Sequence, residues 1–246
     1  MAWTSGQKYL AEFVGTFALL LLGGGSAVFT AGTPVEPLAR AVLVSLTFGF
    51  VLLALAYTFG DISGGHFNPA VTISMAVNRR MPLKDVVPYL VAQIVGGIIG
   101  IAVVWGIVSS SSYQYASAKA AALGSQCYSA SGAPLGCAYS LGSVFLLEMA
   151  ITFAFVLVIQ LVTRAESSAK NLAPLAIGGA LMVGNLVAIP VDRASLNPVR
   201  SFSPALLSVQ FNGASWAINE SWLFWVAPIV GGILAALVEM ALRPKP

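Results

Sequence analysis

The chain has 246 residues, of which 58% are hydrophobic and only 9% charged, and its mean hydropathy is +0.87. Because a soluble domain carries about 25% charged residues, this composition excludes an ordinary soluble protein and indicates a membrane protein. The net charge of +3 is explained by the placement of cations around the apolar segments, so it gives no reason to expect a nucleic-acid partner.

Six long apolar runs follow one another along the chain, at residues 9–30, 39–59, 86–108, 142–162, 172–189 and 222–242. Each is close to the roughly 20 residues that a membrane-spanning helix needs. The first run is too long for the apolar part of a signal peptide and contains Glu12, which favours a span there as well.

The cations around these runs predict the orientation of the chain. With six spans both termini lie on one side, and eight of the twelve cations fall on that side. These eight are Lys8, Arg79, Arg80, Lys84, Arg164, Lys170, Arg243 and Lys245, against Arg40, Lys119, Arg193 and Arg200 on the other side. Because cytoplasmic flanks carry the excess of Lys and Arg, we expect a multi-pass protein of the plasma membrane with both termini in the cytoplasm.

Two short polar segments, residues 61–80 and 190–208, interrupt the apolar pattern and are too short to cross the membrane and return. Each contains an Asn-Pro pair, at residues 68–69 and 197–198. Asn is a favoured N-cap and Pro a favoured first helical residue, so each pair predicts a helix start. Irregular backbone at membrane depth requires protein or a water-filled cavity around it. We therefore expect two re-entrant loops, each followed by a half-helix.

The chain also repeats itself. Residues 12–16 (EFVGT) resemble residues 148–152 (EMAIT), and residues 92–98 (AQIVGGI) resemble residues 227–233 (APIVGGI). Three spans separate the two halves, so the second half is inverted relative to the first. The sequence predicts one all-α channel domain over residues 1–246, with six transmembrane helices, two half-helices and repeats at about 9–108 and 142–242. The two Gly-Gly pairs are expected at helix crossings.

Inverted symmetry brings the two Asn-Pro corners together near the middle of the membrane. Each half-helix N-terminus carries about half a positive charge, and each Asn side chain offers N–H donors. A neutral dipole accepts such bonds, whereas a cation is repelled. The loop residues Gly64, Gly65 and His66, with Arg193, Ala194 and Ser195 in the second loop, are expected to line the pore and to turn carbonyl oxygens toward a file of water.

Residues 63–72 (SGGHFNPAVT) and 197–202 (NPVRSF) resemble the two signature motifs of the aquaporin, or major intrinsic protein, family, and the likeness extends over nearly the whole chain. The resemblance implies a right-handed helical bundle, a homotetramer with a pore in each subunit, and no cofactor. It places the pore corners at Asn68, Pro69, Ala70, Asn197, Pro198 and Val199. Val199 departs from the family's usual Ala, and we expect it to adjust the packing or to narrow the lumen slightly.

The resemblance also implies a selectivity ring toward the outer mouth, at Phe48, Asn185, Ala194 and Arg200. Arg200 is permanently charged and has five donors, which suits it to hold water and to repel cations. Asn185 stands where water-selective relatives usually have His, and Ser201 stands where glycerol-conducting relatives usually have Asp. The ring therefore has an intermediate character: we expect water as the main permeant with slow passage of glycerol and small uncharged solutes, and glycerol facilitation as the main role is the alternative.

Some residues allow a second interpretation. Glu12 and Glu148 are expected to accept bonds from re-entrant backbone N–H groups, but ionisable residues within spans also occur in proton-coupled transporters. A catalytic role of His66 is disfavoured, because no nucleophile-base pair surrounds it. Cys127 and Cys137 lie in an outer connection, where a disulfide and two free thiols are both compatible with the sequence. One His and two Cys are too few for a metal site.

Overall fold

The structure is a computed structural model that describes residues 3–111, 116, 122–129, 137–213 and 215–243. It contains six helical segments long and apolar enough to cross a membrane. They are α1 (Ser5–Leu19) continued through η1 (Leu20–Gly24) and α2 (Gly25–Phe29), α3 (Pro37–Ser63), α5 (Leu83–Ser109), α7 (Leu141–Val162), α8 (Ala173–Asp192) preceded by η3 (Lys170–Leu172), and α11 (Leu223–Ala241) preceded by α10 (Ser215–Glu220). The six predicted spans are confirmed, and most extend a few residues beyond the apolar runs.

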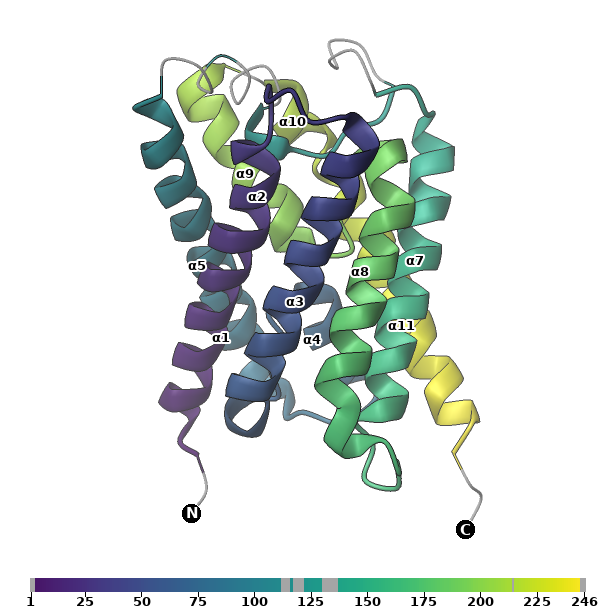
Figure 1. The fold of residues 1–246 in the computed structure, drawn as a ribbon. Coiled ribbons are helices and arrows are strands. Elements are labelled where there is room, and N and C mark those ends of the chain that lie inside the picture. The colour runs from purple at the N-terminus through teal and green to yellow at the C-terminus, as the bar shows by residue number, and fades with distance from the viewer. Residues whose placement is uncertain (1–2, 112–115, 117–121, 130–136, 214, 244–246) are drawn as a thin grey trace.

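Two shorter helices, α4 (Pro69–Val77) and α9 (Pro198–Asn212), are the predicted half-helices. Figure 1 shows α4 in the lower part of the bundle and α9 in the upper part, so one enters from each side. The Asn68 side chain accepts a bond from the Ala70 N–H at 2.9 Å, and Asn197 accepts one from the Val199 N–H at 3.0 Å. Both helices thus begin as the Asn-Pro pairs predict, and the predicted fold class is confirmed.

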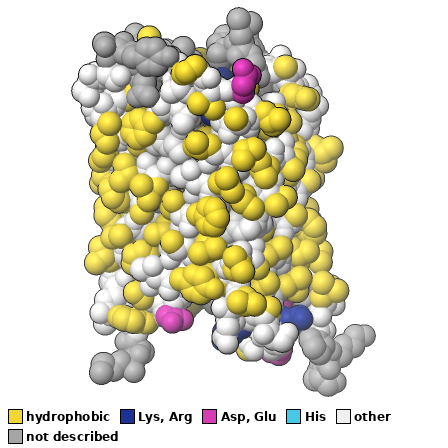
Figure 2. All heavy atoms as spheres, in the orientation of Figure 1, with side chains coloured by type: hydrophobic (Ala, Val, Ile, Leu, Met, Phe, Trp, Pro, Cys, Tyr) yellow, Lys and Arg dark blue, Asp and Glu magenta, His cyan; other side chains and the backbone are white. Residues whose placement is uncertain are grey.

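The distribution of hydrophobic and charged side chains is that of a protein surrounded by lipid. Figure 2 shows hydrophobic side chains over the sides of the bundle and charged ones at its two ends. Phe50 is 62% exposed and Leu146 is 60% exposed, whereas Glu12 and Glu148 are completely buried. Lipid makes this inversion favourable, because polar groups must find partners inside the protein.

The start of α1 and the end of α11 lie at the same end of the bundle (Figure 1). This agrees with an even number of spans, and it places most of the predicted cytoplasmic cations on one side. Lys119 and Lys245, which also enter the charge count, lie outside the described residues.

The structure resolves the open question of the two cysteines. Cys127 and Cys137 form a disulfide, with their Cα atoms 5.6 Å apart. The bridge lies near η2 (Ala122–Gly124), and the segment from Ala122 to Tyr128 is largely buried. The connection between α5 and α7 is therefore partly folded back into the bundle.

Both Gly-Gly pairs lie where helices approach each other closely. A Cβ atom built on Gly96 would lie 2.4 Å from the Phe13 carbonyl oxygen, and one on Gly231 would lie 2.3 Å from the Met149 carbonyl oxygen. Phe13 follows Glu12 as Met149 follows Glu148, so α1 with α5 and α7 with α11 make the same contact in the two halves. Only glycine permits this approach.

Gly97, the second glycine of the first pair, leaves the space on α5 that the Val199 side chain occupies. A Cβ on Gly97 would lie 2.3 Å from Val199 Cγ1 and 2.8 Å from Ser203 Oγ. We expect Gly97→Ala to lower the free energy of unfolding by about 1–3 kcal/mol through overpacking, with Val199→Ala in the same chain recovering part of the loss. Thermal unfolding in detergent measures both. Gly106→Ala on the same helix is the matched control, since nothing lies within 4 Å of its added Cβ; equal effects at Gly97 and Gly106 would contradict the assignment.

Candidate functional site

The two re-entrant loops have the same backbone shape. Three residues of each loop have positive φ at matching distances from the Asn-Pro pair: Gly64 (91°), Gly65 (64°) and Phe67 (49°), and Arg193 (73°), Ala194 (56°) and Leu196 (53°). Left-handed backbone costs non-glycine residues of order 1 kcal/mol or more each. The second loop has no glycine at these positions and therefore depends more on its surroundings to keep this shape.

A buried glutamate supports each loop. Glu12 accepts bonds from the N–H groups of His66 at 2.9 Å and Phe67 at 2.7 Å. Glu148 accepts bonds from the N–H groups of Ser195 at 2.7 Å and Leu196 at 2.9 Å. These backbone donors would otherwise be unsatisfied at membrane depth, so both acids are occupied by the scaffold of the loops.

The two corners meet through their asparagines. Asn68 Nδ2 donates to the Leu196 carbonyl at 2.8 Å, and Asn197 Nδ2 donates to the Phe67 carbonyl at 2.9 Å. Each amide thus bridges to the opposite loop with one hydrogen, while its oxygen caps its own half-helix. A side-chain amide has two N–H bonds, so one hydrogen of each asparagine is available for a molecule between them.

Such a space exists. A narrow cavity with about 20 Å³ of room for water is lined by both asparagines together with His66, Ser195, Phe48, Asn185 and Arg200, and by the apolar residues Leu19, Leu52, Phe155 and Leu181. A water molecule needs about 10–15 Å³ measured in this way. The cavity therefore has room for about one water molecule, with polar groups on part of its wall and apolar side chains on the rest.

Arg200 lines this cavity and is only 4% exposed. Its Nη1 donates to the Gly124 carbonyl at 3.0 Å and its Nη2 to the Arg193 carbonyl at 3.5 Å. The Phe48 ring faces it, with 5.5 Å between the ring centroid and the guanidinium carbon. Backbone carbonyls and an aromatic ring thus hold the cation in place.

Asn185 lines the same cavity and is 3% exposed. Its Nδ2 donates to the Leu181 carbonyl at 2.9 Å, one turn earlier in α8. That bond fixes the amide and leaves its oxygen as an acceptor for a passing molecule. Ala194, the fourth expected ring residue, is fully buried and packs in the hydrophobic core.

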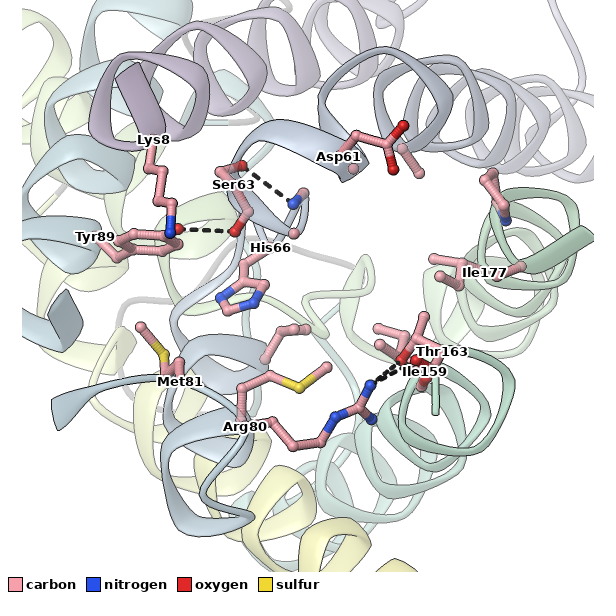
Figure 3. A pocket seen from close by; sticks show the side chains of 18 of the residues that line it. Lys8, Asp61, Ser63, His66, Arg80, Met81, Tyr89, Ile159, Thr163 and Ile177 are labelled. Carbon is pink, nitrogen blue, oxygen red and sulfur yellow. Dashed lines mark hydrogen bonds between the residues drawn. The ribbon is translucent and has the colours of Figure 1, made fainter. Parts of the chain in front are cut away.

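A wider cavity of about 520 Å³ adjoins the narrow one, since Leu52, His66 and Phe155 line both. His66 lines both cavities and so lies at the entrance to the narrow part (Figure 3). Gly64 and Gly65 line the wider cavity. The His66 ring pairs through Nδ1 with Thr72 Oγ1 at 3.1 Å. The Tyr89 hydroxyl donates to the Ser63 carbonyl at 2.7 Å, which ties the end of α3 to α5.

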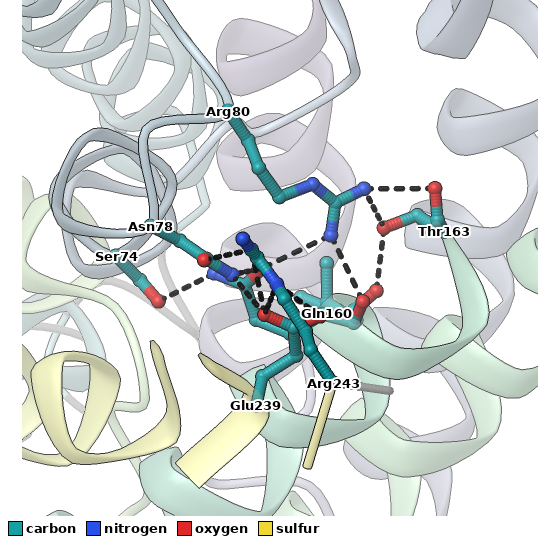
Figure 4. A network of polar contacts seen from close by, with 8 residues as sticks. Ser74, Asn78, Arg80, Gln160, Thr163, Glu239 and Arg243 are labelled. Carbon is teal, nitrogen blue, oxygen red and sulfur yellow. Dashed lines mark hydrogen bonds and ion pairs between the residues drawn. The ribbon is translucent and has the colours of Figure 1, made fainter. Parts of the chain in front are cut away.

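A polar network anchors the far end of α4 (Figure 4). Asn78 donates to Gln160 Oε1 at 2.8 Å and to Glu239 Oε2 at 2.7 Å. Arg80 donates to the carbonyl oxygens of Gln160 at 2.9 Å and Thr163 at 2.8 Å, and burial lowers the pKa of its guanidinium. The first half-helix is therefore fixed at its N-terminus by Asn68 and at its C-terminus by α7 and α11.

The other predicted corner residues serve packing. Ala70 and Val199 are fully buried, and Val199 points toward α5, so its larger side chain affects the contact between α9 and α5. Arg193 Nη1 donates to the Ser125 carbonyl at 3.1 Å. The Arg193 carbonyl accepts from Arg200, as described above, and from Gln126 Nε2 at 3.4 Å. Among the described residues, Pro69, Ala70, Pro198, Val199, Arg193 and Ala194 line neither cavity.

Sequence reasoning missed two groups of residues that shape the site. Gln93 donates to Glu12 Oε2 at 2.7 Å and to Thr72 Oγ1 at 2.9 Å, and its position as a lone polar residue in an apolar span was a usable signal. Gly124 and Gln126 lie in a Ser-, Ala- and Gly-rich connection, where nothing in the sequence marks them as partners of the second re-entrant loop.

Residues 1–239 match the model of a protein family described as Major intrinsic protein. The chain belongs to the major intrinsic protein family. The fold and the resemblance predicted from the two Asn-Pro motifs are thereby confirmed, and so is the expectation of a channel instead of an enzyme.

The relatives of the chain include two bacterial proteins named Aquaporin Z. The one from Rhodopseudomonas palustris is 43% identical over 240 residues, covering 98% of this chain and 95% of the relative. The one from Bradyrhizobium diazoefficiens is 40% identical with the same coverage. Among solved structures, the aquaglyceroporin from Plasmodium falciparum matches with a TM-score of 0.79 at 22% identity, covering 95% of each chain, which shows the common fold alone.

Proposed function

We propose that this chain is a passive water channel whose pore runs through the narrow cavity between the two Asn-Pro corners. The observation that carries the proposal is the pair Asn68 and Asn197, which line one cavity with room for about one water molecule. Both side chains have a free N–H bond available to the lone pairs of that water. The names of the two bacterial relatives support the same function.

Two features of this pore exclude ions. The N-termini of α4 and α9 point their partial positive charges at the narrow cavity, and Arg200 adds a full positive charge toward its outer side. A cation that enters is repelled by both half-helix N-termini and by Arg200. It also loses its hydration shell, which the narrow passage does not replace. A neutral water molecule meets no such barrier, because its oxygen accepts from the asparagine N–H groups while its hydrogens point away from the two corners.

Phe48, Asn185 and Arg200 form the proposed selectivity ring, with Ala194 behind it. In this ring Asn185 Oδ1 is an acceptor and the Arg200 N–H groups are donors for a permeating molecule. Water can form hydrogen bonds with all of these groups, whereas a small polyol can form only some of them. Water is therefore the proposed main permeant, and glycerol a slow one. The structural likeness to an aquaglyceroporin concerns the fold and adds nothing to the glycerol proposal.

Asn185→His tests the ring. The longer imidazole is expected to narrow the passage and to lower the ratio of glycerol to water permeability. Stopped-flow light scattering of proteoliposomes, with osmotic shrinkage for water and re-swelling for glycerol, measures that ratio. Val183→Ile serves as the control, because Val183 lies on the same helix and is 55% exposed. A glycerol flux unchanged by the histidine would exclude Asn185 from the ring.

Passive conduction is separable from coupled transport. A channel gives osmotic water flux in proteoliposomes that have no ion or pH gradient, whereas a proton-coupled transporter gives none. The contacts of Glu12 favour the channel, since Ser63, His66, Phe67 and Gln93 all donate to its carboxyl oxygens. An acid so occupied has no oxygen left to take part in a proton relay.

We further propose that the chain is a single channel domain of two inverted repeats, in the plasma membrane as a homotetramer with cytoplasmic termini. The exposed apolar residues on the sides of the bundle provide surface for lipid and for neighbouring subunits. Native mass spectrometry from nanodiscs tests the tetramer. Gln7 lies near the start of α1, and Glu36 lies in the α2–α3 connection at the opposite end of the bundle. Labelling of single cysteines introduced at these two positions in intact cells tests the orientation.

A further inference from the structure

The inverted repeat pairs Ser63 with Asp192, since each stands five residues before the Asn of its loop. In the first half, the Ser63 hydroxyl has two roles. It donates to Glu12 Oε1 at 2.7 Å and accepts from the Gly65 N–H at 3.1 Å. The hydroxyl therefore connects the supporting glutamate to the turn of the loop, and it does so by giving its hydrogen to the glutamate.

Asp192 makes the same two connections in the second half. Its Oδ1 accepts from the Ala194 N–H at 2.8 Å, as Ser63 accepts from Gly65. Its carboxyl group also lies beside the carboxyl group of Glu148, because the next N–H group along the loop, that of Ser195, donates to Glu148 Oε1 at 2.7 Å. Asp192 is 1% exposed and Glu148 completely buried, and no donor among the described residues reaches Asp192 Oδ2.

A contact between two carboxyl groups requires a hydrogen. Ser195 and Leu196 already donate to the two oxygens of Glu148, and neither carboxyl forms an ion pair within the part of the chain that the structure describes. Two negative carboxylates in contact and shielded from water repel each other strongly, whereas one shared proton turns the contact into a hydrogen bond.

We propose that Glu148 and Asp192 form a proton-binding site, in which Asp192 carries the proton and donates it to Glu148 as Ser63 donates to Glu12, and that this proton holds the second re-entrant loop in its conducting shape. The pair lines neither described cavity. The bound proton is therefore a fixed part of the fold and does not travel along the water path. The proposal goes beyond water conduction, which needs no titratable group.

The surroundings of the pair define what losing the proton does. Among the described residues, the charged group that faces the pair is Arg200 on α9. Arg200 in turn interacts with Arg193 in the loop, and Arg193 interacts with Arg40 on α3 and Glu220 at the end of α10. Deprotonation of Asp192 places a second negative charge beside Glu148. The two carboxylates then repel each other, and together they attract the Arg200 guanidinium toward the pair. Both displacements act on the narrow cavity, through Ser195, whose N–H donates to Glu148, and through Arg200, because both residues line it. We therefore expect water permeability to fall when the proton is lost at alkaline pH.

Asp192→Asn is the decisive variant, because the asparagine amide reproduces the protonated acid and cannot lose its donor in this way. Wild-type and variant proteoliposomes are compared by infrared spectroscopy and by stopped-flow water permeability from mildly acidic to alkaline pH. We expect a carboxylic-acid C=O band in the wild type at neutral pH that is absent from Asp192→Asn. We also expect loss of most of the wild-type permeability at alkaline pH, with a flat profile for the variant.

Asp192→Ser is the second variant and copies the first half of the molecule; it should also give a flat profile without the acid band. Glu36→Gln removes an exposed acid and should behave as the wild type in both measurements. Identical infrared spectra of the wild type and Asp192→Asn at neutral pH would overturn the proposal. A wild-type permeability that does not change with pH, or that changes in the same way in Asp192→Asn, would overturn it as well.

Discussion

Glu12→Ala should prevent the first re-entrant loop from forming and abolish water permeability. The substitution removes the acceptor of four buried donors, on Ser63, His66, Phe67 and Gln93. Each buried donor left without a partner costs about 1–3 kcal/mol, so the loss amounts to several kcal/mol even if the loop relaxes. The fraction of protein that elutes as a single assembly after heating measures stability, and proteoliposome shrinkage measures function.

Glu36→Ala is the control for Glu12→Ala, since Glu36 is an exposed acid without a side-chain cap bond at the start of α3. Glu12→Gln retains one acceptor oxygen and should fall between the alanine variant and the wild type. Wild-type stability and flux in Glu12→Ala would show that the loop does not depend on this acid, and would contradict the role assigned to it.

Arg200→Val should weaken the selectivity of the pore without closing it. The substitution removes a buried cation that contacts Gly124, Arg193 and the Phe48 ring, and it leaves a wider and less polar passage. Interactions with a charged group are worth about 1.5–3 kcal/mol, and each 1.4 kcal/mol is a factor of ten. We expect the ratio of glycerol to water permeability to rise about ten- to hundredfold, together with a measurable proton leak.

Stopped-flow scattering gives the permeability ratio for Arg200→Val, and a pH-sensitive dye enclosed in the same vesicles gives the leak. Arg79→Asn removes an exposed cation near the end of α4, where the φ of 56° is one that Asn tolerates, and should leave both values unchanged. If Arg200→Val kept the wild-type ratio and remained proton-tight, Arg200 would not form the constriction.

The fold was predictable because the features that define it are local or repeated. Apolar length specifies the spans, and Asn-Pro capping specifies the half-helix starts at Asn68 and Asn197. The repeat pairs Glu12 with Glu148 and one Gly-Gly pair with the other, and the structure gives equivalent contacts in both halves. In each of these cases the prediction needs only one segment or the comparison of two similar segments.

The details of the outer part of the pore were not predictable, because they depend on contacts between distant segments. The Gly124 carbonyl that holds Arg200 comes from a connection with no recognisable motif, 76 residues earlier in the chain. The direction of Val199, toward Gly97 and away from the cavity, depends on how α9 packs against α5. The pairing of Asp192 with Glu148 is visible only when the two loops are compared contact by contact.

The central claim is that neutral water crosses between the two Asn-Pro corners while charge does not. Simultaneous recording of osmotic shrinkage and internal pH in wild-type proteoliposomes, without any ion gradient, tests it most directly. The account predicts water permeability well above that of empty liposomes, with an internal pH that stays constant after an external pH step. Shrinkage no faster than that of empty liposomes, or water flux accompanied by proton entry, would contradict it.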